Sequence, residues 1–272
     1  MKAELSSADM YIDVHCHLTG DEYGEVGGIT AVLERAKADG VTRIVCSGFD
    51  LSSSIQACAL AERFPQVYFS AGFHPSELNK YQDGDLEQIR MLCQDKKCIA
   101  VGEIGLDYHF EDNPPKDMQR DMFIRQLQLA YDMHLPVVIH SRDAAQDTLE
   151  LLQAHKTLLG NGGLMHCYSY SPEMTAAFSA LGLSFSFGGP CTFKNAHKVV
   201  ESIARIEKTR LLSETDCPYL TPVPHRGEFP NHPSMVRFAV AKMAEIKQID
   251  EIEMKNQIRE NAKRLFPRLH EK

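Results

Sequence analysis

The sequence YIDVHCHL, residues 11–18, is typical of a short buried strand, and it ends in two histidines. Side chains two residues apart on a strand point to the same face, so His15 and His17 would share one face and Cys16 would point to the other. Two imidazoles on one face can bind a metal ion, but a strand histidine is more often a hydrogen-bonded core residue. The remaining sequence is needed to choose between these two interpretations.

Seven further short apolar runs follow along the chain. They are TRIVCSGF, VYFSAGFHP, CIAVGEIGLDY, LPVVIHSR, GGLMHCYS, LSFSFGG and LLSETDCP. Amphipathic segments separate them; in ITAVLERAKADG, Ile29, Val32 and Leu33 fall on one helical face and Gly40 suits a C-terminal cap. Eight strand–helix alternations predict a parallel sheet that closes into a (β/α)8 TIM barrel, with residues 1–272 as one domain. A doubly wound open sheet is the alternative, but it usually has fewer strands, and no glycine-rich phosphate turn follows the first run.

Composition and net charge exclude some classes of protein function. The chain has 272 residues, is 43% hydrophobic and carries a net charge of −8, which argues against a protein that coats a polyanion. A nucleic-acid enzyme stays open, because bound divalent ions can supply positive charge locally. The eight cysteines form no close C-x-x-C pair, and no segment has the apolar pattern of a signal peptide or a membrane span. We therefore expect a reduced, intracellular protein of the cytoplasm or nucleus, with no membrane and no obligate protein partner.

Side chains that can bind a metal stand at the C-terminal ends of six of the eight predicted strands. They are His15, His17, His74, Glu103, Asp107, His140, His166, Glu214 and Asp216. Function collects at this end of a (β/α)8 barrel, whereas chance would have spread such residues over both ends. Four histidines with two carboxylates exceed the ligand set of one tetrahedral ion, and a carboxylate can bridge two ions about 3.5–4 Å apart. The sequence thus suggests a binuclear site whose nitrogen and oxygen ligands fit Zn, Mn or Co better than Mg.

Three cysteines, Cys16, Cys167 and Cys217, each stand one residue from a proposed ligand. Strand alternation would turn their side chains away from the metals. We interpret them as small buried hydrophobic residues rather than as ligands.

Six motifs in this order, DVHCHL, GFHP, VGEIGLD, PVVIHSRDA, MHCY and ETDCPYL, resemble those of the TatD family of metal-dependent deoxyribonucleases. The match runs from the first strand to at least Tyr219. The resemblance implies a (β/α)8 hydrolase with two divalent ions (Mg, Mn or Zn) that removes nucleotides from the 3′ end of DNA, including single-stranded ends. It also implies two ligand sets that share Glu103 as a bridge. One set would be His15, His17, Glu103 and Asp216, and the other Glu103, His140 and His166.

Catalysis at such a site would need an activated water and a proton acceptor. Divalent ions lower the pKa of a bound water towards neutrality. Asp216 could both ligate an ion and accept the proton, and Glu103 would hold the two ions together. We expect Asp107 and Glu214 to orient ligands.

The residues that would bind substrate have alternative interpretations. Arg142 could clamp a phosphate oxygen or form a salt bridge at a helix start, and His74 could contact phosphate or cap the turn at Pro75. His225 and Arg226 could bind phosphate from the long loop 221–234, or that loop could serve only as rigid packing. Lys194 is a further cation that could reach phosphate. The segment FEDNPPKD, residues 110–117, is interpreted as a simple connection.

The loop PHRGEFPNHP departs from the family pattern. Glu228 stands where family members often have lysine, and His232 stands where they often have glutamate. These changes leave the proposed metal ligands intact but affect the part of the chain that would meet the substrate.

Three functions remain open on the sequence alone. The favoured one is a metal-dependent deoxyribonuclease, an exonuclease acting from the 3′ end. The second is an amide or lactone hydrolase of the related amidohydrolase type, in which the ions would polarise a carbonyl. The third is a non-enzymatic scaffold that binds metal.

Overall fold

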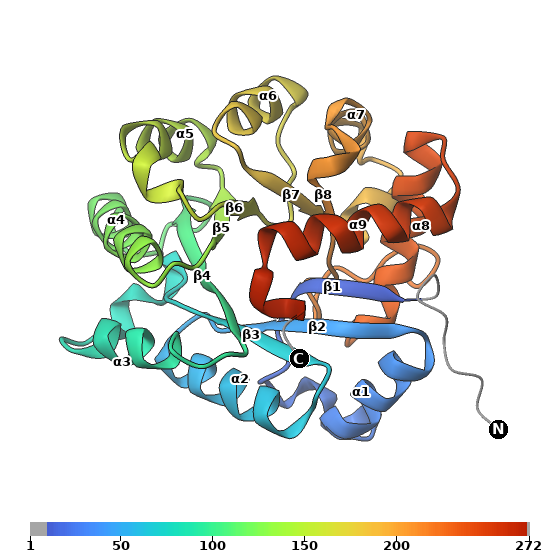
Figure 1. The fold of residues 1–272 in the computed structure, drawn as a ribbon, viewed down its shortest axis with the longest axis horizontal. Coiled ribbons are helices and arrows are strands. Elements are labelled where there is room, and N and C mark those ends of the chain that lie inside the picture. Colours follow the sequence, from blue (N-terminus) through green and yellow to red (C-terminus); the bar gives the residue numbers. More distant parts are fainter. Residues whose placement is uncertain (1–9, 271–272) are drawn as a thin grey trace.

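The computed structural model describes residues 10–270, and its centre is a sheet of eight parallel strands in the order β1 to β8 (Figure 1). The strands are β1 Tyr11–Cys16, β2 Val41–Ser47, β3 Val67–Ala71, β4 Cys98–Asp107, β5 Val137–Arg142, β6 Gly163–Met165, β7 Ser184–Phe187 and β8 Leu211–Ser213. Each strand pairs in parallel with the next, as a βα alternation requires. The sheet curls into a nearly closed barrel, which confirms the predicted (β/α)8 architecture and excludes the open sheet.

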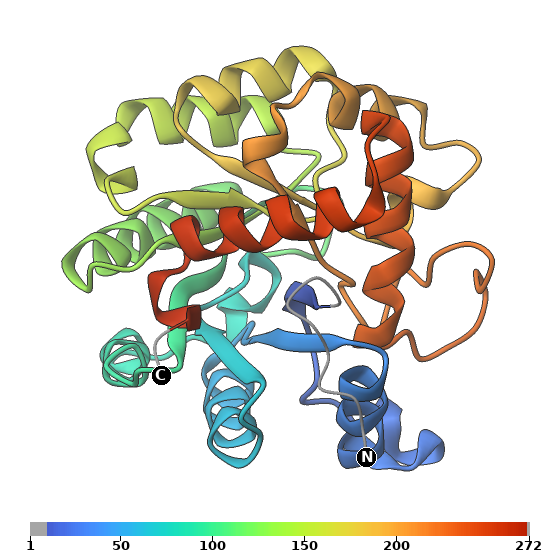
Figure 2. The same ribbon diagram turned by 45° about the vertical axis from the view of Figure 1, so that its right-hand side comes forward.

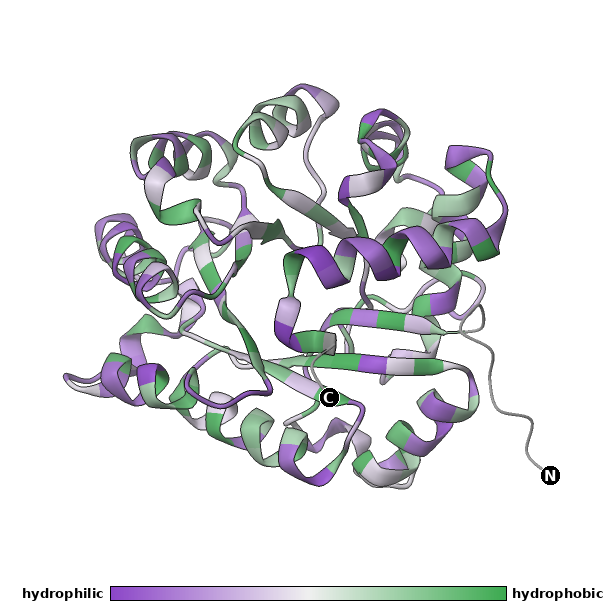
Figure 3. Cartoon of the chain, viewed as in Figure 1, coloured by the Kyte–Doolittle hydropathy of each residue, from purple (hydrophilic) through white to green (hydrophobic). Residues whose placement is uncertain are grey.

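Helices surround the barrel (Figures 1 and 2). They are α1 Gly28–Ala38, α2 Leu51–Arg63, α3 Asp85–Leu92, α4 Lys116–Asp132, α5 Ala145–Ala154, α6 Pro172–Ala180, α7 His197–Arg205, α8 Val236–Lys247 and α9 Glu251–Leu265. The predicted face of α1 is the buried one, since Val32, Leu33 and Ala36 lie in the core. In Figure 3 the outer helices carry both hydrophilic and hydrophobic residues, as elements with one face in water should.

The seam between β1 and β8 is joined largely by side chains. The Ser213 hydroxyl donates to the carbonyl of Ile12 at 2.7 Å. The Thr215 backbone N–H and hydroxyl donate to the two oxygens of buried Asp13, at 2.9 and 2.6 Å. Just beyond the strands, the Asp216 N–H donates to the carbonyl of His15 at 3.0 Å. The first and last strands are therefore held together next to the residues that the sequence marked as metal ligands.

Helix α9 and the short helix η8, Pro267–His270, cover the N-terminal end of the barrel. The side-chain amide of Asn261 on α9 donates to the carbonyls of Lys208 and Leu211, where β8 begins, at 2.7 and 2.8 Å. Arg268 donates to the carbonyl of Cys93, just after α3, and to that of Cys98, where β4 begins. Figure 2 shows α9 running across the molecule to this point. The opposite end of the barrel, where the strands finish, is not covered by α9 or η8.

Within residues 10–270, no helix is both long and apolar enough to cross a lipid bilayer. All eight cysteines are free thiols, and six of them are buried.

Candidate metal centre

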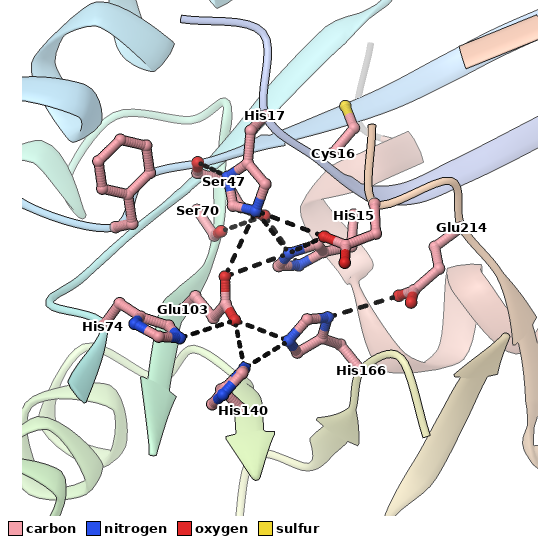
Figure 4. Close-up of polar contacts among 12 residues, drawn as sticks. His15, Cys16, His17, Ser47, Ser70, His74, Glu103, His140, His166 and Glu214 are labelled. Carbon is pink, nitrogen blue, oxygen red and sulfur yellow. Dashed lines mark hydrogen bonds and ion pairs between the residues drawn. The ribbon is translucent and has the colours of Figure 1, made fainter. Parts of the chain in front are cut away.

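Four side chains, from the end of β1, from β4 and from the segment after β8, converge and form the first ligand group. Figure 4 labels three of them, His15, His17 and Glu103. His15 Nε2 lies 3.3 Å from His17 Nε2, 3.3 Å from Glu103 Oε2 and 3.6 Å from Asp216 Oδ1. His17 Nε2 lies 3.5 Å from each of the same two oxygens. Ligands about 2.1 Å from a tetrahedral ion would stand about 3.4 Å from one another. The spacing of this group therefore fits a single divalent ion.

The second ligand group surrounds the other oxygen of Glu103. Oε1 lies 2.7 Å from His166 Nε2, 2.9 Å from His140 Nδ1 and 3.5 Å from His74 Nε2. His140 Nδ1 and His166 Nε2 are 3.3 Å apart. The two oxygens of Glu103 thus face two different sets of imidazoles. This second group is tighter than the first, with two of its contacts at hydrogen-bond distance.

Neighbouring oxygens orient the imidazoles of the first group. His17 Nδ1 lies 3.0 Å from the carbonyl of Ser47, so the ring proton sits on Nδ1 and the lone pair of Nε2 faces the cluster. His15 Nδ1 lies 3.0 Å from the Ser47 hydroxyl, which receives a hydrogen bond from Ser70. The orientation of both rings therefore depends on Ser47, the last residue of β2. Contacts of this kind behind the ligands are known to tune metal sites.

The second group has acidic neighbours. Asp107 Oδ2 lies 2.9 Å from His140 Nε2, which leaves Nδ1 of that ring for the cluster. Glu214 Oε2 lies 3.9 Å from His166 Nδ1 and accepts a 2.5 Å hydrogen bond from Ser186. Burial raises the pKa of Glu214 to about 7. Asp107 and Glu214 therefore stand behind the proposed ligands, where the sequence placed them, although His166 Nδ1 has no hydrogen bond within residues 10–270.

The two carboxylates of the cluster are ionised at neutral pH. Burial alone would raise the pKa of Glu103, but electrostatic interactions with His166, His74 and His15 hold it well below the usual range. Burial likewise opposes ionisation of Asp216, yet the hydrogen bond with His17 and the nearby imidazoles lower its pKa to about 2. Carboxylate oxygens beside imidazole nitrogens are a donor set that suits divalent cations.

His74 differs from the other four histidines. Its Nδ1 accepts a 3.2 Å hydrogen bond from the backbone N–H of Ser76 and so caps the short helix η3, Pro75–Lys80. A neutral ring that accepts at Nδ1 carries its proton on Nε2, the nitrogen that faces Glu103. Burial, followed by the charge of His140, lowers the pKa of His74 to about 3, so the ring is neutral. His74 therefore presents an N–H donor to the cluster, and both of its sequence interpretations remain compatible with this position.

The cysteines next to the ligands behave differently from one another. Cys16 Sγ points away from the cluster in Figure 4 and lies 3.2 Å from the carbonyl of Val45. Cys16 and Cys217 gather with Asp13 behind the strands, where Asp13 is already bound to Thr215. The expectation that strand alternation turns Cys167 away was wrong. Cys167 lies beyond β6 rather than on a strand, with φ of 43°, and it lines the cavity in front of the cluster. None of the metal-competent groups within residues 10–270 includes Cys167.

A cavity of about 840 Å³ lies over the cluster and opens to solvent. Of the proposed substrate-binding residues, His74 and Arg142 line it. Arg142 is exposed, pairs with no carboxylate among residues 10–270, and places its guanidinium 5.1 Å from the centre of the Phe110 ring. Phe110 also lines the cavity, so the segment 110–117 is more than the simple connection expected from the sequence. Its signal was its place directly after a strand that ends in Asp107.

The loop after β8 places His225 and Arg226 outside the residues that line this cavity. His225 lies 2.9 Å from Glu228, and Arg226 stacks on Phe193 with its guanidinium 4.1 Å from the ring centre. Lys194 is exposed and also outside the lining. His232 is buried, and burial lowers its pKa to about 4. A role of His225 and Arg226 in binding substrate stays a prediction.

Comparison with known proteins extends the likeness over the whole barrel. Residues 12–267 match the protein family described as TatD related DNase. A Bacillus subtilis (strain 168) protein named uncharacterized metal-dependent hydrolase YabD is 41% identical over 94% of this chain and 99% of its own length. The Escherichia coli (strain K12) uncharacterized metal-dependent hydrolase YcfH is 36% identical over 94% and 95%. The crystal structure of YJJV, a TatD homologue from Escherichia coli K12, superposes with a TM-score of 0.88 at 31% identity over 96% and 99%.

Proposed function

This chain belongs to the family of TatD-related DNases, which are metal-dependent hydrolases, and from that premise we propose that it hydrolyses the terminal phosphodiester at the 3′ end of DNA. The observation that carries the proposal is Glu103, whose two oxygens face two separate groups of imidazoles. That arrangement supports a binuclear site, and sites of this kind serve in the hydrolysis of phosphodiesters.

Two ions would be held by residues that already converge. His15, His17 and Asp216 would bind one ion and His140 and His166 the other, with Glu103 between them. Bound divalent ions of this kind, Zn, Mn or Mg, acidify water and neutralise charge on phosphoryl oxygens. Asp216 supports the role of proton acceptor, because it is ionised at neutral pH and keeps part of its side chain open to the cavity.

Two further side chains support binding of a phosphate. His74 offers its Nε2–H next to Glu103, and a neutral donor there can bind a phosphoryl oxygen without adding charge. Arg142 lies at the cavity rim, where its guanidinium can pair with a phosphate in a bidentate manner. The preference for an end follows from shape: a frayed or single-stranded terminus enters a cavity at the end of a barrel more readily than the middle of a duplex.

The experiment compares linear and closed circular single-stranded DNA of one sequence, with the stripped protein reloaded with Mg, Mn or Zn. With the label at the 5′ end, we expect linear DNA to shorten stepwise from the 3′ end and circles to resist. Linear duplex and RNA of the same sequence are further arms. Circles cut as fast as linear strands would refute the end-directed mechanism.

A panel of dipeptides and lactones tests the alternative chemistry on the same preparations. Hydrolysis of these carbonyl compounds, without hydrolysis of any DNA, would assign the site to amide or lactone substrates. Glu103→Gln serves as the inactive control in every arm, so that a contaminating nuclease is recognised.

A further inference from the structure

We propose that Phe110 and Tyr219 form two nucleobase-stacking positions, one on each side of the phosphodiester that is hydrolysed. This inference rests on the nuclease function proposed above and adds how the substrate is recognised. The flat faces of unpaired bases, rather than a row of phosphates, would hold the end of the strand over the cluster.

The two rings stand on opposite sides of the cavity. Phe110 follows β4 and Tyr219 follows β8, and these strands are half-way round the barrel from each other. Both residues line the cavity over the cluster. Phe110 comes three residues after Asp107, the partner of His140 in the second group. Tyr219 comes three residues after Asp216 of the first group. Each ring therefore belongs to the side of one ligand group.

Both rings are exposed although their backbones are fixed. Phe110 is 52% and Tyr219 is 55% exposed, which is unusual for large aromatic residues. The Tyr219 N–H donates to the carbonyl of Asp216 at 3.1 Å, and its own carbonyl accepts a 2.6 Å hydrogen bond from buried Asn231. The Phe110 carbonyl accepts from the N–H of Asn113, whose side chain is bound to Asp107. An exposed ring on a fixed backbone loses little entropy when a base stacks on it.

Charge in the cavity argues against recognition through phosphates. Among the described residues that line it, Arg142 is the only lysine or arginine. Six lining residues are carboxylates: Glu22, Asp50, Glu77, Glu103, Asp107 and Asp216. Away from bound ions this lining would repel a polyanion. Stacking on an aromatic face needs no opposite charge and accepts any base.

Arg142 and His109 hold the Phe110 ring in place. The guanidinium lies 5.1 Å from the ring centre, within the range of a cation–π interaction. The His109 ring lies 4.6 Å from the Phe110 ring, centre to centre, and is nearly perpendicular to it at 81°. Because Arg142, at the end of β5, also lines the cavity, this side of the cavity offers a stacking face and a cation together.

The test uses metal-loaded protein and 5′-labelled single-stranded DNA in which the last or the last-but-one nucleotide at the 3′ end lacks its base. Loss of one stacked base generally weakens binding by about fivefold to a hundredfold. We expect the wild-type kcat/KM to fall by about tenfold for each abasic substrate relative to intact DNA. Phe110→Ala and Tyr219→Ala should each lose a similar factor on intact DNA and become insensitive to one of the two abasic positions.

Three control variants sharpen the result. Phe110→Tyr and Tyr219→Phe keep a ring and should retain wild-type discrimination. Phe229→Ala removes a ring that is 62% exposed on the same loop as Tyr219 but outside the cavity, and it should change nothing. Equal hydrolysis of intact and abasic DNA by the wild type, or alanine variants that keep the discrimination, would overturn the stacking proposal alone. Failure to hydrolyse any DNA would overturn it together with the nuclease function.

Discussion

Among single residues, His17 and His140 are each oriented by a contact from another strand. The positions of His15, His17, His140 and His166 after buried runs were enough to predict that they converge. Which ring nitrogen faces the cluster depends on contacts far along the chain, such as Ser47 behind His17 and Asp107 behind His140. His74 shows the limit most clearly, because the contacts of its Nδ1 with Ser76 leave Nε2 to face the cluster.

Replacement of Glu103 by glutamine tests the bridge. The change keeps the shape but removes the charge that would hold two cations together, so we expect loss of at least one metal per chain and a fall in kcat of about a thousandfold or more. Elemental analysis after dialysis measures the metal, and circular dichroism checks the fold. The matched control is Glu77→Gln, which lines the same cavity but pairs with Lys80. Full metal occupancy in the Glu103 variant would contradict the bridging role.

Substitutions at the end of β1 and just after it test which way the side chains of this segment face. Cys16 faces Val45 on the far side of β1, so Cys16→Ser should leave metal content unchanged and lower the free energy of unfolding by about 1–2 kcal/mol. His17→Ala should weaken metal binding sharply, because it removes one donor of the first group. Isothermal titration of the stripped proteins with Zn compares the two. An equal loss of affinity in the Cys16 variant would mean that the cysteine takes part in binding.

At the scale of the element, the periodicity of short apolar runs predicted all eight strands, and it predicted them too long at the end of the barrel. β6 ends at Met165 and β8 at Ser213, so His166 and Asp216 lie on turns beyond the ladder. Asp216 has φ of 53°, a conformation that strand alternation does not describe. The position of α9 could not be predicted either, because a helical pattern indicates a helix but not the end of the barrel that it covers.

Asn261 tests how α9 closes the barrel. Its amide serves two carbonyls in a buried position, and Asn261→Ala would leave both without that donor. We expect the free energy of unfolding to fall by about 2–3 kcal/mol, as measured by urea denaturation. Asn256 lies on the exposed side of the same helix. The control variant Asn256→Ala should change the free energy of unfolding by less than about 0.5 kcal/mol. Equal midpoints for the two variants would show that Asn261 does not fasten the helix.

For the molecule as a whole, its negative charge limits how it can bind DNA. The net charge is −8, and among the described residues that line the cavity Arg142 alone is a lysine or arginine. Few cations at the cavity can therefore replace the counterions of DNA. The acidic balance was readable from composition, whereas the location of the carboxylates around the cavity required the fold.

The dependence of affinity on salt tests this reasoning. With about two phosphates contacted by the protein, the logarithm of the association constant for single-stranded DNA should fall with the logarithm of salt concentration at a slope of about −1.4. Fluorescence anisotropy with a hydrolysis-resistant phosphorothioate oligonucleotide measures the slope. A slope steeper than about −4 would require about six contacts and would mean that basic residues outside the cavity bind the backbone.

The seam between β1 and β8 gives the first ligand group a mechanical role as well. Two of its ligands follow from β1 and one from the segment after β8, so an ion held by all three would act as a clasp across the join of the barrel. Separating the first strand from the last would then require the ion to leave first. Metal-loaded protein should therefore unfold more slowly than stripped protein in the same urea, with the folding rate less affected. The same ion would then serve the chemistry and hold the first strand to the last.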